Sequence, residues 1–306
     1  MRINVIGSST ATAIDNIMRP LAWQLQKHGH DIRYYRMPRP GLNECDFLHF
    51  GWWRLIHAVL LKSKEETGGV RPTVPFTAHL HHLEAAKEAQ FVEAQPLLKE
   101  AGCLGYIVSD SYWKQRLGAL GITNAWQIPQ AFDHSRFHPL PLPEEFTVGW
   151  LGTNYPYKRF DTARLAVQLA GVASVDNGRR DLLEKGSPEW LGSALDFHRR
   201  ISAYIVTTFT DTGPLPPQEA MLCGRPVITT TMGMMRDLVA HKVNGYVFDG
   251  SVEDLAVAIH WVRDHLTELH ENVLATTLLR LPALAAVTRQ YEDLFQRLLS
   301  RVEVPA

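Results

Sequence analysis

Two acidic residues flank a proline-rich segment in the C-terminal half of the chain. Asp211 and Glu219 are separated by seven residues, Thr-Gly-Pro-Leu-Pro-Pro-Gln. The run 204–208 before this segment predicts a strand, and we expect a helix to begin near Gln218. A helix N-terminus combines unpaired N–H groups with the positive end of the helix dipole, which suits a phosphate. Asp211, before the loop, and Glu219, expected in the first helical turn, could accept hydrogen bonds from sugar hydroxyls.

The residues after this segment complete a longer pattern. Glu219 is followed by Ala220, and Gly-Arg-Pro-Val occupies positions 224–227. Glycine followed by proline is typical of the end of a helix. The whole block resembles the retaining GT-B glycosyltransferases of family 4, whose signature is Glu, seven residues, Glu-Ala, then Gly-x-Pro-Val.

The resemblance implies a role for each part of the block. Glu219 would contact the ribose of a nucleotide sugar, and Asp211 would contact the sugar that is transferred. The loop between them would bring backbone groups of Thr212, Gly213 and Leu215 close to the sugar and the diphosphate. The family has Glu where this chain has Asp211, so the shorter carboxylate changes the expected sugar contact.

Four shorter segments resemble the same family in the same order along the chain. They are Thr77-Ala78-His79, residues 126–133 with Phe137 and Pro139, residues 148–151 with Lys158, and residues 244–247. The resemblance implies that His79 lies near the transferred sugar and that Lys158 binds the diphosphate. Trp150 stands where the family has a second diphosphate-binding cation, and Arg159 and Arg179 are two alternatives for that charge.

Three glycines are further candidates for donor binding. Gly149 belongs to the segment that resembles the start of the family's second domain. Gly7 follows the first expected strand, in a turn that would face the cleft or serve the fold alone. Gly233 lies among three methionines, and its backbone could approach the sugar while the methionines pack.

Alternating strands and helices predict two α/β domains. Apolar runs predict strands at 2–6, 31–35, 46–50, 73–78, 105–109 and 125–128, and again at 146–151, 173–175, 204–208, 226–230 and 245–248. The helices expected between them include 53–62, 83–101, 189–199 and 252–264. A strand, helix, strand order requires a parallel sheet.

Three prolines in the segment 138–145 indicate a linker between the two series. We therefore predict an N-terminal, acceptor-side Rossmann-like domain over 1–139 and a C-terminal, nucleotide-sugar-binding Rossmann-like domain over 140–280. The tail, 281–306, is expected to form a helix that packs back on the first domain. The fold class is α/β, and the resemblance implies GT-B, with two facing domains and a cleft between them.

Composition limits the remaining functions. The 306 residues carry a formal net charge of −1, which does not favour a broad nucleic-acid surface. Three separated cysteines fit reduced thiols, and the sequence predicts no signal peptide and no transmembrane helix, so we expect a cytoplasmic protein. His81 and His82 have no matching ligand set and no Asp-x-Asp motif is present, so we predict no metal and no cofactor. The donor substrate would be a UDP- or GDP-linked sugar.

Several alternatives stay open. The same donor site would serve a GT-B nucleotide-sugar epimerase or a noncatalytic relative that binds nucleotide sugars. The absence of G-x-G-x-x-G and P-loop motifs disfavours a dehydrogenase or a P-loop protein. The acceptor could be a saccharide, a lipid, a small molecule or a modified nucleobase in DNA. DNA would require a basic cleft, for which the candidates are Arg33, Arg36, Arg39 and Arg54. The aromatic run 50–54 either packs in a core or forms a stacking platform.

Overall fold

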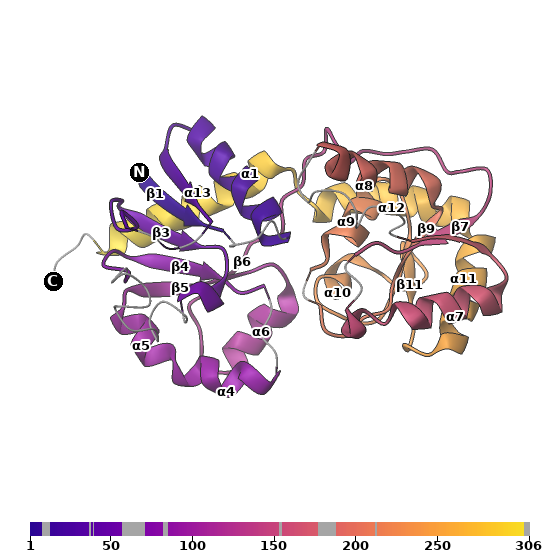
Figure 1. The fold of residues 1–306 in the computed structure, drawn as a ribbon, viewed down its shortest axis with the longest axis horizontal. Coiled ribbons are helices and arrows are strands. Elements are labelled where there is room, and N and C mark those ends of the chain that lie inside the picture. The colour runs from indigo at the N-terminus through magenta and orange to yellow at the C-terminus, as the bar shows by residue number, and fades with distance from the viewer. Residues whose placement is uncertain are drawn as a thin grey trace. The chain divides into compact units, whose positions relative to one another are not determined.

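The chain forms two compact units. The computed structural model describes residues 1–7, 13–36, 38, 40–56, 71–81, 85–152, 155–176, 188–211 and 213–302. The first unit comprises Met1–Ala131 and Ala283–Ala306, and the second comprises Phe132–Pro282 (Figure 1). Residues 132–139, expected in the first domain, group with the second because Phe132 and Phe137 are buried in its core.

The first unit contains a six-stranded parallel sheet of order β2-β1-β3-β4-β5-β6. Its elements are β1 (Arg2–Ile6), α1 (Ala13–Lys27), β2 (Asp31–Tyr35), β3 (Phe47–Phe50), β4 (Phe76–His79), α4 (Ala85–Glu93), α5 (Gln95–Glu100), β5 (Cys103–Val108), α6 (Ser111–Ala119), β6 (Ala125–Gln127) and α13 (Leu284–Val302). Residues 53–56 are helical, and the rest of the helix expected over 53–62 lies outside the described residues. The helix expected over 83–101 is divided at Ala94, because Pro96 is tolerated only in a first helical turn.

The last helix of the chain, α13, belongs to the first unit and packs against α1. Its Phe295 is fully buried, with its ring 4.8 Å from that of Phe47 on β3. Glu292 accepts hydrogen bonds from His28 and His30, which follow α1. The C-terminal helix therefore contributes both apolar and polar contacts to the N-terminal sheet.

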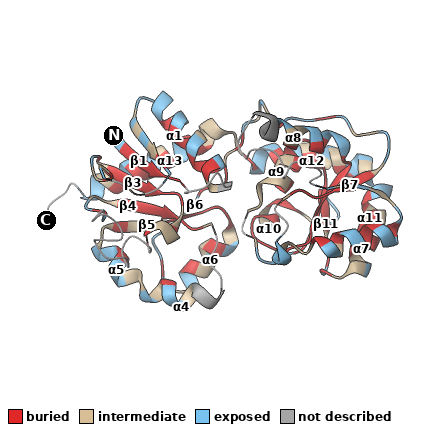
Figure 2. Ribbon diagram, viewed as in Figure 1, coloured by how far each residue is buried: buried red, intermediate tan, exposed pale blue. Residues whose placement is uncertain are grey.

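The second unit contains a five-stranded parallel sheet of order β11-β10-β9-β7-β8. Its elements are β7 (Thr147–Gly149), η1 (Pro156–Lys158), α7 (Phe160–Ala170), β8 (Ala173–Val175), α8 (Pro188–Arg200), β9 (Ala203–Val206), α9 (Leu215–Leu222), β10 (Val227–Thr229), α10 (Met235–Leu238), β11 (Gly245–Val247), α11 (Val252–Asp264) and α12 (Leu266–Arg280). Strands of both sheets are largely buried (Figure 2). This burial on both faces is the usual state of a parallel sheet covered by helices.

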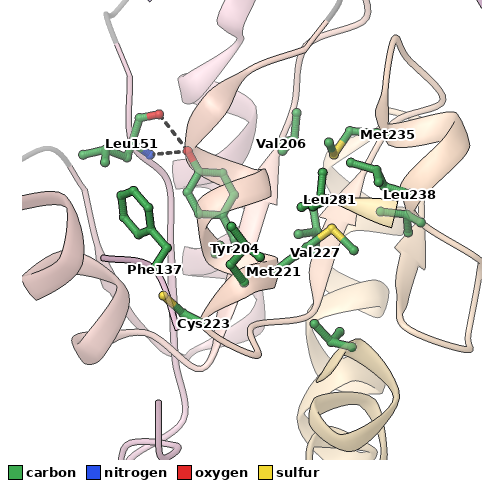
Figure 3. Close-up of a cluster of buried hydrophobic side chains, with 14 of the residues drawn as sticks. Phe137, Leu151, Tyr204, Val206, Met221, Cys223, Val227, Met235, Leu238 and Leu281 are labelled. Carbon is green, nitrogen blue, oxygen red and sulfur yellow. Dashed lines mark hydrogen bonds between the residues drawn. The ribbon is translucent and has the colours of Figure 1, made fainter. Parts of the chain in front are cut away.

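Two apolar clusters cover the second sheet. One joins residues of α8, α9 and α10 to β9, and Figure 3 shows part of it, including the Tyr204 hydroxyl bonded to the backbone of Leu151. The other joins α7 and α11 to β7, and contains Trp150 and Phe160. Among the described residues, no helix combines the length and the apolar character that crossing a membrane requires.

Candidate functional site

Helix α9 begins earlier than the sequence suggested. It starts at Leu215, with Pro214 as the N-cap and Pro216 and Pro217 in its first turn, not near Gln218. Proline is tolerated there because the N–H groups of a first turn have no partner within the helix. The expectation that Glu219 lies in the first turn is therefore wrong, since Glu219 is in the second turn.

The same prolines change what the helix start can offer an anion. The N-cap and the first three helical positions are the ones whose N–H groups are left over in an α-helix. Here three of the four are proline, so Leu215 alone contributes an N–H. The positive end of the dipole remains, but the predicted set of helical N–H donors is largely absent. Thr212 lies outside the described residues.

An ion pair lies at the carboxyl edge of the second sheet. Lys158 ends η1, which follows β7, and Asp211 lies on the loop that follows β9. Strands β7 and β9 are parallel neighbours, so the segments that leave them meet at one edge. The Lys158 ammonium pairs with the Asp211 carboxylate, and these side chains are 17% and 21% exposed. Two residues predicted to be catalytic are thus in direct contact.

The neighbourhood of this pair is a small recess in the second unit. Tyr157 lies close to the pair, and burial together with the charge of Asp211 raises the pKa of its hydroxyl. The recess is lined by strand, loop and helix-start residues, namely Leu151, Lys158, Phe160, Tyr204, Ile205, Val206, Thr207, Thr208, Pro214 and Pro217. A cation, hydroxyl groups and apolar surface therefore converge where β9 ends and α9 begins.

Glu219 contacts a histidine that the sequence did not single out. Its Oε2 is 3.6 Å from Nε2 of His198 on α8, with side-chain exposures of 14% and 0%. No pattern in the sequence singles out His198, because a histidine near the end of an amphipathic helix is ordinary. The contact arises from the packing of α8 against α9.

Trp150 stands where the resembled family has a second cation, and its side chain lies in the hydrophobic core of the second unit. Trp150 is buried, with its ring 6.4 Å from that of Phe160. Arg159, one proposed substitute, adopts a left-handed conformation with φ of 54°. Its guanidinium donates to the Gly250 carbonyl at 2.9 Å and lies over the Phe209 ring. Arg159 therefore joins two loops, and the other substitute, Arg179, lies outside the described residues.

Two of the candidate glycines are required by packing. A Cβ at Gly149 would meet Ile201 and Phe197 side-chain atoms at 2.7 and 2.8 Å. A Cβ at Gly7 would lie 1.9 Å from the hydroxyl oxygen of Tyr34, which donates a hydrogen bond to Asp15. Packing alone therefore explains why a glycine occupies each of these positions.

The third candidate glycine, Gly233, has a φ of 37°, in the region that favours glycine. The neighbouring methionines Met232, Met234 and Met235 are buried in the core of the second unit. The methionines therefore pack, as expected.

His79, in the first unit, is enclosed by its own unit. It ends β4 with 1% exposure, and burial holds the pKa of its imidazole well below the usual value. Its Nε2 is 3.1 Å from the hydroxyl oxygen of Ser109, and its Nδ1 is 3.2 Å from that of Tyr291 on α13. His81 stacks on it at 3.9 Å between ring centroids. The ring is therefore neutral, and both nitrogens have partners in the first unit.

A second buried histidine extends this polar cluster. His49 on β3 is fully buried, and its Nδ1 is 3.0 Å from the hydroxyl oxygen of Thr77. Burial lowers the pKa of His49 to about 3. The sequence did not single out His49, since its strand is predicted by its apolar neighbours alone.

The remaining candidates have ordinary surroundings. Arg33 donates to Glu44, and Arg36 lies 3.7 Å from the Asp15 carboxylate, so neither is an isolated positive charge. In the aromatic run, Phe50 and Trp53 are buried in the first core, while Trp52 is partly buried and Arg54 lies over its ring. Arg39 and His82 lie outside the described residues. Within the described ranges, no group of three or more His, Cys, Asp or Glu is arranged to hold a metal ion.

Comparison with known proteins identifies the architecture. Sucrose-phosphate synthase from Thermosynechococcus elongatus superposes with a TM-score of 0.76 at 14% identity, covering 98% of this chain and 100% of that one. HepE from Anabaena, in complex with UDP and glucose, gives 0.71 at 15% identity, covering 97% and 99%. A glycosyltransferase from Rickettsia africae gives 0.69 at 12% identity, covering 97% and 98%. The chain has the GT-B fold.

The second unit, which contains the ion pair, also matches the model of a known protein family. The model of the family described as Glycosyl transferases group 1 matches residues 192–272. This stretch includes Asp211, Glu219 and His198 but not Lys158 or His79. No curated protein matches the chain. The predicted fold class is confirmed, and the sequence likeness is concentrated around the loop from β9 to α9.

Proposed function

We propose that the chain is a glycosyltransferase that moves a sugar from a nucleoside-diphosphate sugar to an acceptor with retention of configuration. The observation that carries the proposal is the contact between Lys158 and Asp211, beside the start of α9. The likeness of residues 192–272 to the group 1 family supports the donor site, and the UDP and glucose in the HepE complex favour a UDP-linked donor.

Lys158 would bind the diphosphate and balance the charge that develops on it as the glycosidic bond breaks. Preorganised positive charge at a leaving group is among the largest contributions to catalysis. With three prolines at the start of α9, few backbone N–H groups share this task, so the lysine carries more of it. Asp211 neutralises the ammonium before the donor binds, and would then accept hydrogen bonds from hydroxyls of the transferred sugar.

The remaining contacts follow from the position of the loop. Glu219 would accept hydrogen bonds from the ribose hydroxyls, and Thr212, Gly213 and Leu215 would approach the sugar and diphosphate through their backbones. Gly149 and Gly233 would approach the donor through their backbones in the second domain.

We expect transfer without a bound metal, because Lys158 and the dipole of α9 supply the positive charge that a metal would otherwise provide. Addition of EDTA should leave the rate of transfer unchanged. A rate that falls with EDTA and recovers with a divalent cation would contradict this part of the proposal.

A thermal-shift panel of UDP-, GDP-, ADP- and TDP-linked sugars tests donor binding. A ligand that binds only the folded state raises its stability by about 2.7 kcal/mol at a hundred times Kd, so the preferred donor should raise Tm by a few degrees. At the same ligand concentration, Glu219→Ala should show a clearly smaller shift than wild type while retaining its own cooperative transition. A wild-type Tm that no nucleotide sugar changes would overturn the proposal.

NMR of the preferred donor then tests the reaction. Incubated with a set of saccharide, lipid and small-molecule acceptors, the donor should give a product whose anomeric configuration matches that of the donor. Without an acceptor, the sugar should stay unchanged. Interconversion of the sugar in the donor alone would indicate an epimerase, and an inverted product would contradict retention.

A further inference from the structure

His198 occupies a cage of aromatic side chains inside the second unit. Its ring makes edge contacts with Phe137 and Phe197, with centroid separations of 6.0 and 5.4 Å, and lies 6.2 Å from the Tyr204 ring. Figure 3 shows Phe137 and Tyr204 in the surrounding core. The imidazole is completely buried. Its orientation is therefore fixed by packing, as a positioning group requires.

The backbone of His198 is also fixed. Arg225, itself fully buried, donates from Nε to the His198 carbonyl at 3.0 Å. Its other two nitrogens donate to the carbonyls of Leu140 and Pro141 at 3.3 and 2.7 Å. One guanidinium thus joins the end of α8 to the segment that precedes β7. A charged group so completely buried is retained where it satisfies several carbonyls at once.

The contact between His198 and Glu219 favours one tautomer of the imidazole ring. An ionised carboxylate only accepts hydrogen bonds, so the tautomer of His198 that suits Glu219 carries its hydrogen on Nε2. The separation of Nε2 and Oε2 is 3.6 Å, slightly beyond hydrogen-bond length. The contact therefore orients the carboxylate electrostatically, and it engages one of the two carboxylate oxygens.

We propose that His198 is a positioning residue that holds one oxygen of Glu219 and directs the other toward the hydroxyls of a ribonucleotide. The inference rests on the proposed function, in which Glu219 contacts the ribose. It adds a determinant of specificity, because a carboxylate held in place rejects a sugar that lacks the hydroxyls. Sites built to bond a hydroxyl discriminate strongly against analogues without it.

The test is isothermal titration with UDP, GDP and ADP, each beside its 2′,3′-dideoxy counterpart. Wild-type protein should prefer the ribonucleotide of its best base by about tenfold or more, as a lost bond to a charged group costs roughly 1.5–3 kcal/mol. His198→Phe keeps an aromatic ring in the cage but has no hydrogen-bond donor. For this variant the dissociation constants of the ribonucleotide and its dideoxy counterpart should differ by less than about threefold. Glu219→Gln should behave similarly.

Two variants separate positioning from general support of the fold. His198→Gln restores an N–H donor and should recover much of the preference. Phe137→Leu removes one wall of the cage and leaves the imidazole, so it should keep the preference even if both nucleotides bind more weakly. If His198→Phe does not fold, His198→Asn, whose amide is too short to reach Glu219, carries the same expectation.

The outcomes also distinguish this inference from the proposed function. A wild-type protein that binds none of the nucleotides overturns both. A wild-type preference that persists in His198→Phe overturns the role of His198 and leaves the nucleotide site standing.

Discussion

The ends of strands β4 and β9 carry the polar residues predicted to be catalytic, yet they are built differently. At the end of β4, His79 is neutral, buried and bonded to Ser109 and Tyr291 within the first unit. At the end of β9, Asp211 pairs with Lys158, and both side chains are partly exposed. The hydrogen bonds of His79 are made within the folded unit, whereas the charges of Lys158 and Asp211 remain accessible to a ligand.

This difference separates stability from binding. A buried polar group that loses its partner costs the full penalty of desolvation, so the β4 cluster should matter chiefly for stability. A partly exposed ion pair contributes little to stability, so the β9 pair is free to be reorganised by a charged ligand. Substitutions at the end of β4 should therefore change the free energy of unfolding, and substitutions at the end of β9 should change donor binding and transfer.

The largest effect is expected from Lys158→Ala. Loss of one preorganised group that stabilises transition-state charge typically lowers kcat by about a hundredfold to a thousandfold. Steady-state transfer kinetics measure this, and Tm should change little. Lys99→Ala, on an exposed position of α5, is the matched control and should retain wild-type kcat. Equal kcat in both variants would remove Lys158 from the reaction.

The next effect is expected from Tyr291→Phe. The variant leaves Nδ1 of His79 without the tyrosine hydroxyl, and this should lower the free energy of unfolding by about 1–3 kcal/mol. Urea denaturation measures the loss, and the donor Kd should stay at its wild-type value. Tyr112→Phe, at a partly exposed tyrosine of α6, is the control and should unfold like wild type. A change in donor Kd without a change in stability would reverse the assignment of the β4 cluster.

The buried histidines predict a pH dependence of stability. The pKa of His49 is about 3 and that of His79 is also depressed, while the value in an unfolded chain is about 6.5. Above pH 6.5 both states are neutral, and the stability is fully present. As the pH falls from 6.5 toward 3 the unfolded chain takes up protons first, so His49 should cost about 1.4 kcal/mol per pH unit, and His79 should lower the stability in the same direction.

Urea denaturation at pH 7, 6 and 5 checks this slope, and His49→Gln provides the comparison. The advantage of wild type over the variant should shrink as the pH is lowered. An advantage that is constant across this range would mean that His49 does not keep its depressed pKa in the folded protein.

The smallest effect is expected from Asp211→Glu, which restores the longer carboxylate of the resembled family. The pair with Lys158 should be retained, so kcat/KM should stay within about tenfold of wild type. Asp211→Asn removes the charge and should be clearly worse in the same assay. If Glu and Asn at this position were equally impaired, the length of the side chain and not its charge would be what matters.

The sequence anticipated the elements better than the contacts. Every expected strand is present within a few residues, because apolar runs bounded by turn residues define buried strands. Helix α9 begins earlier than the sequence predicts, because Pro216 and Pro217 are typical of a loop but are also accepted in a first helical turn. The contact between Lys158 and Asp211 joins the end of η1 to the loop that follows β9, so only the order of strands in the sheet brings them together.

His198 and His49 show a second limit. His198 lies on α8 and His49 on β3, and the pattern of apolar residues predicts both elements. That pattern carries no information on which polar side chain each histidine will contact. Trp150 is the opposite case, since its place in the core follows from its apolar ring, although the resembled family has a charged residue at this position.

Calorimetric titration of the preferred nucleotide sugar into wild type and Glu219→Ala tests whether the donor binds at the loop from β9 to α9. The proposed donor site is the loop from β9 to α9, so the variant should bind about tenfold to a hundredfold more weakly, as expected for a lost hydrogen bond to a charged group. Identical dissociation constants for the two proteins would contradict the assignment of this loop as the nucleotide-sugar site.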